Sequence, residues 1–184
     1  MEAFDYLSVL VSIILGLGIT QLLSGFGTWL EQRRSFRAYG PAIAWSAFLL
    51  LVHVQTWWSM YGMRDTESWN FLQFALVLLQ PILLYLLAVI VLPGPNAPQN
   101  DPRENFHMQR RWFFGLLLAT VVASIVKDLS RMELPDATNL IFHGVFGGVS
   151  LLGFIHGGER VQRFVAFFSF AAFALYVSLL FAEL

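Results

Sequence analysis

The residues best suited to chemistry are a few ionisable and amide side chains inside long apolar runs. They are His53, Gln55, Lys127, Asp128 and His143. A polar group at membrane depth costs free energy unless it is paired or lines water, so such residues point to a solute or proton path. Histidine titrates near neutrality, and carboxylates relay protons in pumps. We expect the five residues to share one side of a membrane, as an outer polar cluster that lines a vestibule or carries protons.

Helix packing explains the same residues without a further function. A buried histidine or glutamine that bonds to a neighbouring helix holds the two helices together. Lys127 lies near the end of its apolar run, so its side chain can snorkel to the interface, and Asp128 can pair with Arg131 three residues on. The sequence leaves both interpretations open.

Two of these histidines, His53 and His143, are also the candidates for axial haem ligands on different helices. No other cofactor and no metal site are predicted. The chain has no cysteine, which removes disulfides, thiolate catalysis and sulfur-ligated metal sites. The motifs of metalloproteases, serine hydrolases and phosphate-binding loops are also missing from the sequence, so an enzyme is the less favoured interpretation.

The elements that must position these residues are membrane helices. Of the 184 residues, 57% are hydrophobic and 12% are charged, and the mean hydropathy is +0.64. A soluble domain of ordinary composition carries about twice that share of charged residues. The net charge of −1 and the lack of a basic aromatic patch argue against a nucleic-acid partner. Composition therefore predicts a chain whose surface is covered by lipid.

Six apolar runs, each with the ~20 residues that a membrane span needs, predict the fold. We expect an all-α, polytopic integral membrane protein: a six-transmembrane-helix bundle that forms one domain over residues 1–184. The predicted helices cover residues 6–29, 41–61, 69–92, 112–129, 138–155 and 164–182. The proline-rich segment 93–111 is predicted to be a loop between two three-helix halves, which an inverted duplication would relate.

The basic residues predict the orientation, because short loops rich in Lys and Arg tend to stay in the cytoplasm. Three alternate loops carry Arg33, Arg34, Arg37, Arg103, Arg110, Arg111, Arg160 and Arg163, whereas the opposite side carries Arg64, Lys127 and Arg131. We therefore expect a bacterial-type cytoplasmic membrane, with both termini outside and the arginine-rich loops in the cytoplasm.

Small residues predict where helices meet, since close backbone approach supplies much of the attraction between helices in lipid. The first helix carries Ser12, Gly16, Thr20 and Ser24 at a four-residue spacing, and the fifth carries the pair Gly144 and Gly148. We expect both sets at helix interfaces. Six short helices enclose little volume, so a homo-oligomer or partner membrane subunits are expected in addition to the lipid bilayer.

The sequence favours two functions from different classes. The first is a permease or channel for a small or cationic solute, in which the outer polar cluster forms part of the path. The alternative is a non-catalytic accessory or structural subunit of a membrane complex, whose small-residue surfaces bind partner helices. A b-type haem membrane protein is the third.

Overall fold

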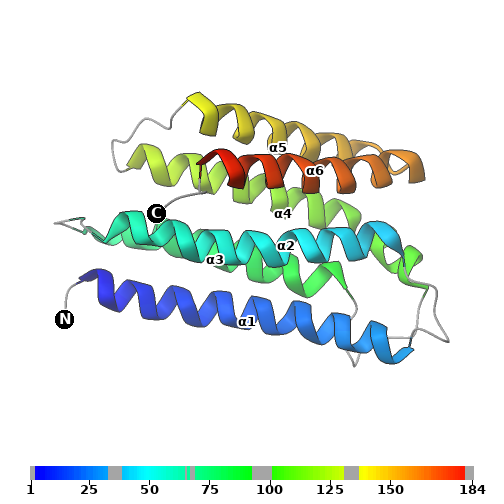
Figure 1. Ribbon diagram of the computed structural model, residues 1–184, viewed down its shortest axis with the longest axis horizontal. Coiled ribbons are helices and arrows are strands. Elements are labelled where there is room, and N and C mark those ends of the chain that lie inside the picture. The colour runs from blue at the N-terminus through cyan, green and yellow to red at the C-terminus, as the bar shows by residue number, and fades with distance from the viewer. Residues whose placement is uncertain are drawn as a thin grey trace.

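The computed structural model describes residues 3–32, 39–64, 66, 69–92, 101–130 and 137–180, and its long helices run along one common direction (Figure 1). Every regular element within these ranges is helical. The elements are α1 (Ala3–Gln32), α2 (Gly40–Ser59), the 3-10 turn η1 (Met60–Met63), α3 (Phe71–Val91), α4 (Pro102–Ser130), α5 (Ala137–Ile155) and α6 (Glu159–Leu180). The all-helical fold predicted from the apolar runs is confirmed.

The largest departure from the predicted boundaries is the start of α4. The helix begins at Pro102, so the prediction of a loop is wrong for residues 102–111. Asp101 caps the helix: its carbonyl oxygen accepts from the amide of Asn105 at 2.9 Å, and its carboxylate accepts from the amide of Arg103 at 2.8 Å. Proline suits the first helical position, because the amide it lacks would have no partner there. The sequence analysis missed these first turns of the helix because their residues are polar.

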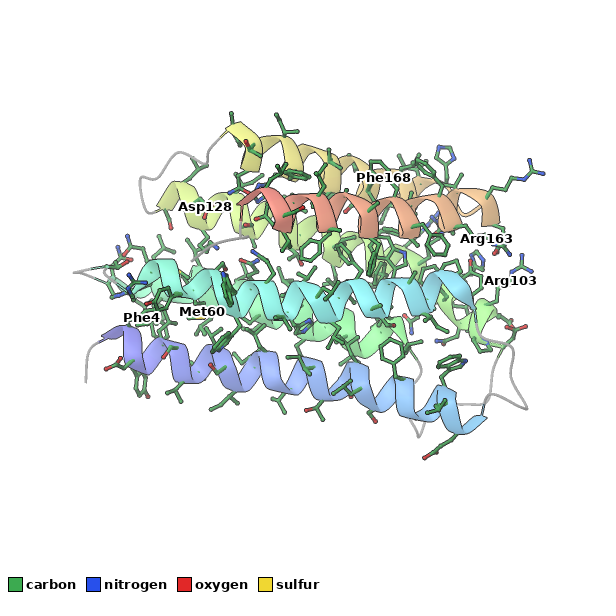
Figure 2. The ribbon with its side chains drawn as sticks, viewed as in Figure 1. Phe4, Met60, Arg103, Asp128, Arg163 and Phe168 are labelled. Atoms are coloured by element: carbon green, nitrogen blue, oxygen red, sulfur yellow. The ribbon has the colours of Figure 1, made fainter. Side chains whose placement is uncertain are left out.

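Consecutive helices run in opposite directions, so α1 begins and α6 ends at the same end of the bundle (Figure 1). We call this the termini end, and Asp128 lies near it (Figure 2). The other end holds Arg103 and Arg163 (Figure 2), and we call it the arginine end.

The central helix of the bundle is α2, which packs against α1, α3, α4 and α6. The other contacting pairs are α1 with α3, α3 with α4, α4 with α5, and α5 with α6. The buried face of α2 includes Trp45, Phe48, Leu49 and His53.

Five helices of the described chain, α1, α3, α4, α5 and α6, are long and apolar enough to cross a membrane. Their outward faces carry large apolar side chains, such as Ile13 and Leu17 on α1 and Phe164 and Phe167 on α6, which are more than half exposed. Apolar surface on this scale marks contact with lipid or with other proteins. The structure therefore has the character of a helical membrane protein.

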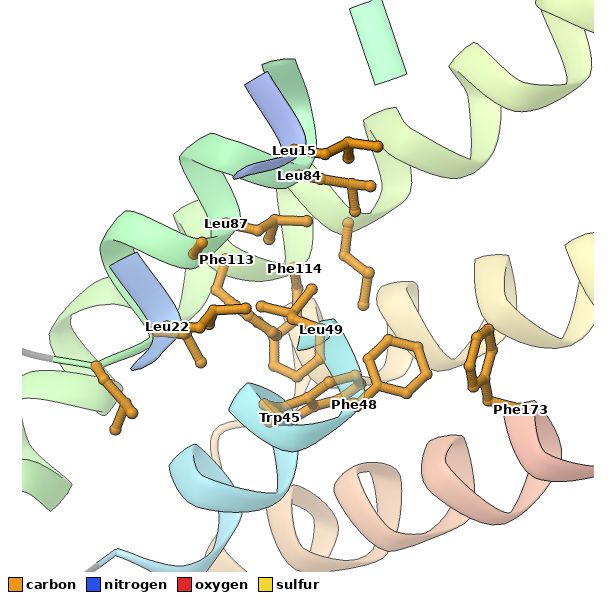
Figure 3. Packing of buried hydrophobic residues seen from close by; sticks show 14 of the residues in the cluster. Leu15, Leu22, Trp45, Phe48, Leu49, Leu84, Leu87, Phe113, Phe114 and Phe173 are labelled. Atoms are coloured by element: carbon orange, nitrogen blue, oxygen red, sulfur yellow. The ribbon is translucent and has the colours of Figure 1, made fainter. Parts of the chain in front are cut away.

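The core of the arginine half is built from aromatic rings. Trp45 is fully buried and meets the rings of Phe48, Phe113 and Phe114 edge-on, at centroid distances of 5.2, 5.1 and 5.6 Å (Figure 3). Phe114 fits only because α5 has a glycine opposite it: a Cβ on Gly153 would lie 2.3 Å from the ring. The tight contact between α4 and α5 thus depends on glycine, which has no side chain, at position 153.

The predicted packing residues face outward within this chain. Ser12, Gly16, Thr20 and Ser24 are exposed on α1, and Gly144 and Gly148 are exposed on α5. A Cβ added at Gly16, Gly144 or Gly148 would meet no described atom of another element within 4 Å. Ser12 contacts a neighbouring helix by accepting a hydrogen bond from the Trp57 indole of α2 at 3.2 Å. The close approaches are made instead by Gly18, Gly25 and Gly153, so an interface at the predicted residues would need a second chain.

Candidate functional site

A cavity of about 100 Å³ lies between α2, α3, α4, α5 and α6, toward the termini end of the bundle. We call it the α2–α6 cavity. Its polar lining is Gln55, Gln80, Thr120, Ser124, Asn139, His143 and Tyr176, and its apolar lining is Phe48, Val52, Leu84, Leu117, Val121, Phe142, Phe146 and Phe173. Polar side chains from all five helices therefore converge on one space inside an apolar bundle.

Helical spacing explains why the polar residues converge. On α4, Thr120 and Ser124 are four residues apart, and so are Asn139 and His143 on α5, so each pair shares a helix face. Thr120 donates its hydroxyl to the carbonyl of Leu116 at 2.9 Å, and His143 Nδ1 lies 2.7 Å from the carbonyl of Asn139. When the imidazole is neutral, Nδ1 donates this bond and Nε2 is left as an acceptor.

One hydrogen-bond acceptor in a residue of the cavity lining has no partner within the described chain. The amide oxygen of Asn139 is buried and has no hydrogen-bond partner within the described chain. An unpaired buried polar atom costs about 1–3 kcal/mol. Five other buried side-chain atoms of the described chain are also without a partner, among them His53 Nε2 and Gln162 Oε1, and Asn139 is the one such residue that lines the α2–α6 cavity. Asn139 is one of the polar lining residues that the sequence analysis missed, although its four-residue spacing from His143 was a signal that could have identified it.

Aromatic rings form one wall of the cavity. Phe142 meets Tyr176 at a centroid distance of 5.1 Å, and Phe48 meets Phe173 at 5.3 Å (Figure 3). Phe146 joins the two pairs, at 6.5 Å from Phe142 and 5.9 Å from Phe48. Five connected rings thus line the same cavity as Asn139.

Four of the five residues predicted as an outer polar cluster belong to this region. Gln55 and His143 line the cavity directly. Lys127 donates to the Gln80 side-chain oxygen at 3.4 Å, and its ammonium lies 3.8 Å from the Asp128 carboxylate. Lys127 therefore reaches across to α3. Arg131, the partner predicted for Asp128, lies outside the described residues.

His53 is the predicted member that the structure places elsewhere. It is fully buried where α2 meets α1, and its Nδ1 lies 2.7 Å from the carbonyl of Leu49. A Cβ on Gly18 would lie only 2.2 Å from His53 Nε2, so the imidazole is packed directly against the α1 backbone. His53 thus acts in helix packing, on a different face of α2 from Gln55.

This geometry does not fit the haem ligands proposed from the sequence. The Nε2 atom that would bind iron at His53 is blocked by the backbone of Gly18. The space beside His143 is about 100 Å³, whereas ligand and cofactor sites commonly occupy ~300–1,000 Å³. The two histidines therefore do not form an axial pair. The described residues also contain no group of three or more side chains of the kinds that hold a metal ion.

A second polar network lies at the arginine end, and the sequence analysis did not identify it. Glu159 accepts from Arg163 at 3.0 Å and from Tyr39 at 3.2 Å, and it forms an ion pair with Arg103 at 3.2 Å. Burial and the nearby Glu159 carboxylate raise the pKa of Tyr39 to about 12. The signal in the sequence was an acidic residue inside an arginine-bearing loop. The network ties α4 and α6 to the segment before α2.

Backbone carbonyls at the end of α5 are also capped there. Arg110 donates to the carbonyl oxygens of Gly153 and Phe154 at 2.6 and 2.5 Å. Gln162 donates to the carbonyl of His156 at 2.7 Å. The last carbonyls of a helix lack partners inside the helix, so these donors satisfy groups that would otherwise be unpaired.

No protein-family model matches the chain, and neither a curated protein nor a solved structure is significantly similar to it. The chemistry of the α2–α6 cavity must therefore be judged from its own residues. The cavity offers amide and imidazole acceptors, hydroxyl groups and aromatic faces, and no lining side chain carries a carboxylate or an ammonium group. These groups are of the kind that hydrogen-bond a small polar group, and among the described residues no hydrogen bond joins a lining hydroxyl to the imidazole of His143.

Proposed function

We propose that the protein is a small helical membrane permease that binds a compact cationic solute in the α2–α6 cavity. The observation that carries the proposal is the unpartnered amide oxygen of Asn139 beside five aromatic rings. The oxygen accepts an N–H bond from the solute. The ring faces attract a cation, by roughly 0.5–2 kcal/mol at each favourable contact.

The surrounding charges are compatible with a cation. Lys127 is the nearby positive group, and its ammonium is engaged by Gln80 and by Asp128, whose negative charge offsets it. Asp128 also interacts electrostatically with Tyr176, which lines the cavity. The remaining polar lining groups are amides, hydroxyls and the imidazole of His143, whose oxygen or nitrogen lone pairs can accept a hydrogen bond from the solute.

The volume of the cavity limits the solute. About 100 Å³ is the space of a few water molecules, since each occupies roughly 30 Å³ in the liquid. The proposed solute therefore has a head of only a few heavy atoms, such as guanidinium or methylammonium.

In this proposal all six helices cross the membrane, with α2 in the centre, the termini end outside and the arginine end in the cytoplasm. The cavity is then reached from outside, past Gln55, His143, Lys127 and Asp128. The rings around Trp45 separate it from the cytoplasm, so passage requires them to move. A rocking of the α1–α3 half against the α4–α6 half, as in transporters built from inverted halves, would supply that movement.

Uptake of radiolabelled guanidinium into proteoliposomes tests the proposal. Guanidinium keeps its charge at every usable pH, so it does not cross lipid as a neutral base, and its planar face stacks on aromatic rings. We expect saturable uptake by the wild-type protein and a loss of about tenfold or more in Asn139→Leu, because the N–H acceptor is gone. A tenfold loss corresponds to about 1.4 kcal/mol, within the range of a hydrogen bond to a charged group.

The matched control is Val122→Leu, which changes an exposed side chain on α4 that does not line the cavity. It should transport like the wild type. Uptake by the wild type no faster than into protein-free liposomes would refute the permease.

A second candidate function is the accessory subunit, and the outward-facing glycines favour it. A Cβ added at Gly144, Gly147 or Gly148 would meet nothing within 4 Å among the described atoms, so this face of α5 could admit another helix closely. Native mass spectrometry after gentle extraction tests this. A stable mass above that of the monomer, lost in Gly148→Leu, is expected for an oligomer or a complex, and a monomer under all conditions would refute it.

A further inference from the structure

We infer that the solute is amphiphilic: a compact cationic head occupies the α2–α6 cavity, and an alkyl tail lies in an adjoining groove between α2 and α6. This inference rests on the proposed function and names the class of its substrate. The tail of such a substrate enters its groove from the lipid, between the two helices, while the head reaches the cavity from the outer aqueous side.

The groove holds about 350 Å³ and is lined by Leu51, Val54, Gln55, Trp58, Phe173, Ala174 and Val177. We call it the α2/α6 groove. Its walls are almost entirely apolar, and Leu51 and Val54 are 43% and 52% exposed on the outer surface of the bundle. It therefore lies where acyl chains of the bilayer would be.

The groove and the cavity adjoin each other. Gln55 on α2 and Phe173 on α6 line both of them. A molecule in the groove would thus have its polar end at the amide of Gln55, on the way to Asn139 and His143. A substrate with one charged end and one apolar end matches a polar cavity that adjoins an apolar groove.

Size supports the same conclusion. The cavity alone is smaller than ordinary ligand sites of ~300–1,000 Å³, whereas the groove falls within that range. The head therefore supplies specificity, and the tail supplies most of the contact area. Ala174 is the smallest residue of the groove lining, so a larger side chain at this position would take up part of the groove.

A second apolar groove in the same protein provides an internal comparison. It holds about 490 Å³ between α3 and α4, lined by Leu76, Leu79, Leu83, Gly115, Leu118, Ala119, Val122, Ala123 and Val126. It shares no lining residue with the α2–α6 cavity. This groove has room for a lipid tail but offers no polar end, and the inference assigns it no substrate.

Equilibrium binding of radiolabelled guanidinium and octylguanidinium to the full chain in lipid nanodiscs tests the inference, with binding to empty nanodiscs subtracted. The groove variant is Ala174→Leu. Ala171→Leu is the matched control, since Ala171 is exposed on the same helix and does not line the groove. Partitioning into lipid raises the apparent affinity of the longer probe equally in every variant, so the comparison between variants isolates the groove.

The expected result is that Ala174→Leu weakens octylguanidinium binding about tenfold and leaves guanidinium binding unchanged, while Ala171→Leu changes neither. Asn139→Leu should weaken both probes. If Ala174→Leu leaves octylguanidinium binding unaffected while guanidinium binds, the amphiphilic substrate is refuted, but the proposed permease is not. If Asn139→Leu leaves octylguanidinium unaffected, the probe binds as a lipid tail only, which also overturns the inference. If neither probe binds to the wild type, both the inference and the proposed function fail.

Discussion

The two ends of the bundle differ in what surrounds their polar residues, although each holds a buried amide oxygen that has no partner within the described chain, Gln162 Oε1 at the arginine end and Asn139 Oδ1 at the termini end. At the arginine end, Glu159 is shared by Tyr39, Arg103 and Arg163, and the carbonyls that end α5 are capped by Arg110. At the termini end, the amide oxygen of Asn139 is buried without a partner beside an open space. Groups that satisfy one another stabilise a structure, whereas groups left unsatisfied around a cavity are available to a ligand. The comparison assigns stability to one end and binding to the other.

The largest effect expected from this division is at Gly153. In Gly153→Ala the new methyl group would lie 2.3 Å from the Phe114 ring, so the tight α4–α5 contact must open. Overpacking of this kind costs about 1–3 kcal/mol. Thermal unfolding in detergent should show a clear decrease in Tm. Gly144→Ala is the control: it meets open space and should leave Tm unchanged or slightly raised, because alanine favours helices. Equal shifts in the two variants would contradict the account.

A smaller loss is expected when the cap on α5 is removed. Arg110→Gln takes away the donor to the carbonyls of Gly153 and Phe154. Leaving a carbonyl unpaired costs about 1–3 kcal/mol when the group is fully buried, and the lower part of that range applies at this partly exposed end. Hydrogen exchange should become faster in the last turn of α5. Arg111→Gln removes an exposed side chain instead and should not alter that exchange.

At the termini end, removing a polar group should not lower the stability of the protein. Asn139→Leu removes a buried, unpartnered oxygen, so it should leave the Tm unchanged or raise it, by up to about 1 kcal/mol in stability. The same variant should lose guanidinium uptake. A lowered Tm would show that Asn139 holds the helices together, and the division between the two ends would then be wrong.

The smallest expected effect is a dependence on pH at the arginine end. The pKa of Tyr39 is raised to about 12 in the folded protein, whereas an unfolded tyrosine titrates near 10. The folded state therefore favours the neutral phenol, and this contribution to stability is complete below about pH 10 and is lost as the pH rises toward 12. Tm should fall more steeply over this interval in the wild type than in Tyr39→Phe. Equal dependence of Tm on pH in the two proteins would show that Tyr39 does not contribute to the network at the arginine end.

The sequence was sufficient for the broad fold and for part of the site. Apolar runs located the helices because a bilayer demands long, continuous hydrophobic segments. They missed the first turns of α4, where polar residues extend the helix beyond the apolar stretch. Gln55 and His143, predicted to lie on one side of the membrane because alternate helices reverse direction, line one cavity in the structure.

What the sequence did not predict depends on which way each helix is rotated. His53 and Gln55 are two residues apart on α2, which places them on nearly opposite faces. Only the structure, in which His53 packs against Gly18 of α1, shows which of the two faces away from the cavity. The same uncertainty affected the glycines. Gly16 and Gly144 have the expected spacing, but Gly18 and Gly153 make the close contacts because they happen to face a bulky ring.

The central claim, that a cationic solute reaches the α2–α6 cavity, is tested most directly by thiol accessibility. The chain contains no cysteine, so Ser124→Cys in the cavity lining and Val122→Cys on the exposed face of α4 each carry a single thiol at similar depth. A membrane-impermeant trimethylammonium methanethiosulfonate should modify Ser124→Cys, guanidinium should slow that reaction, and Val122→Cys should stay unmodified. If Ser124→Cys is unreactive, or if guanidinium gives no protection while the reagent enters freely, the cavity is not a cation site.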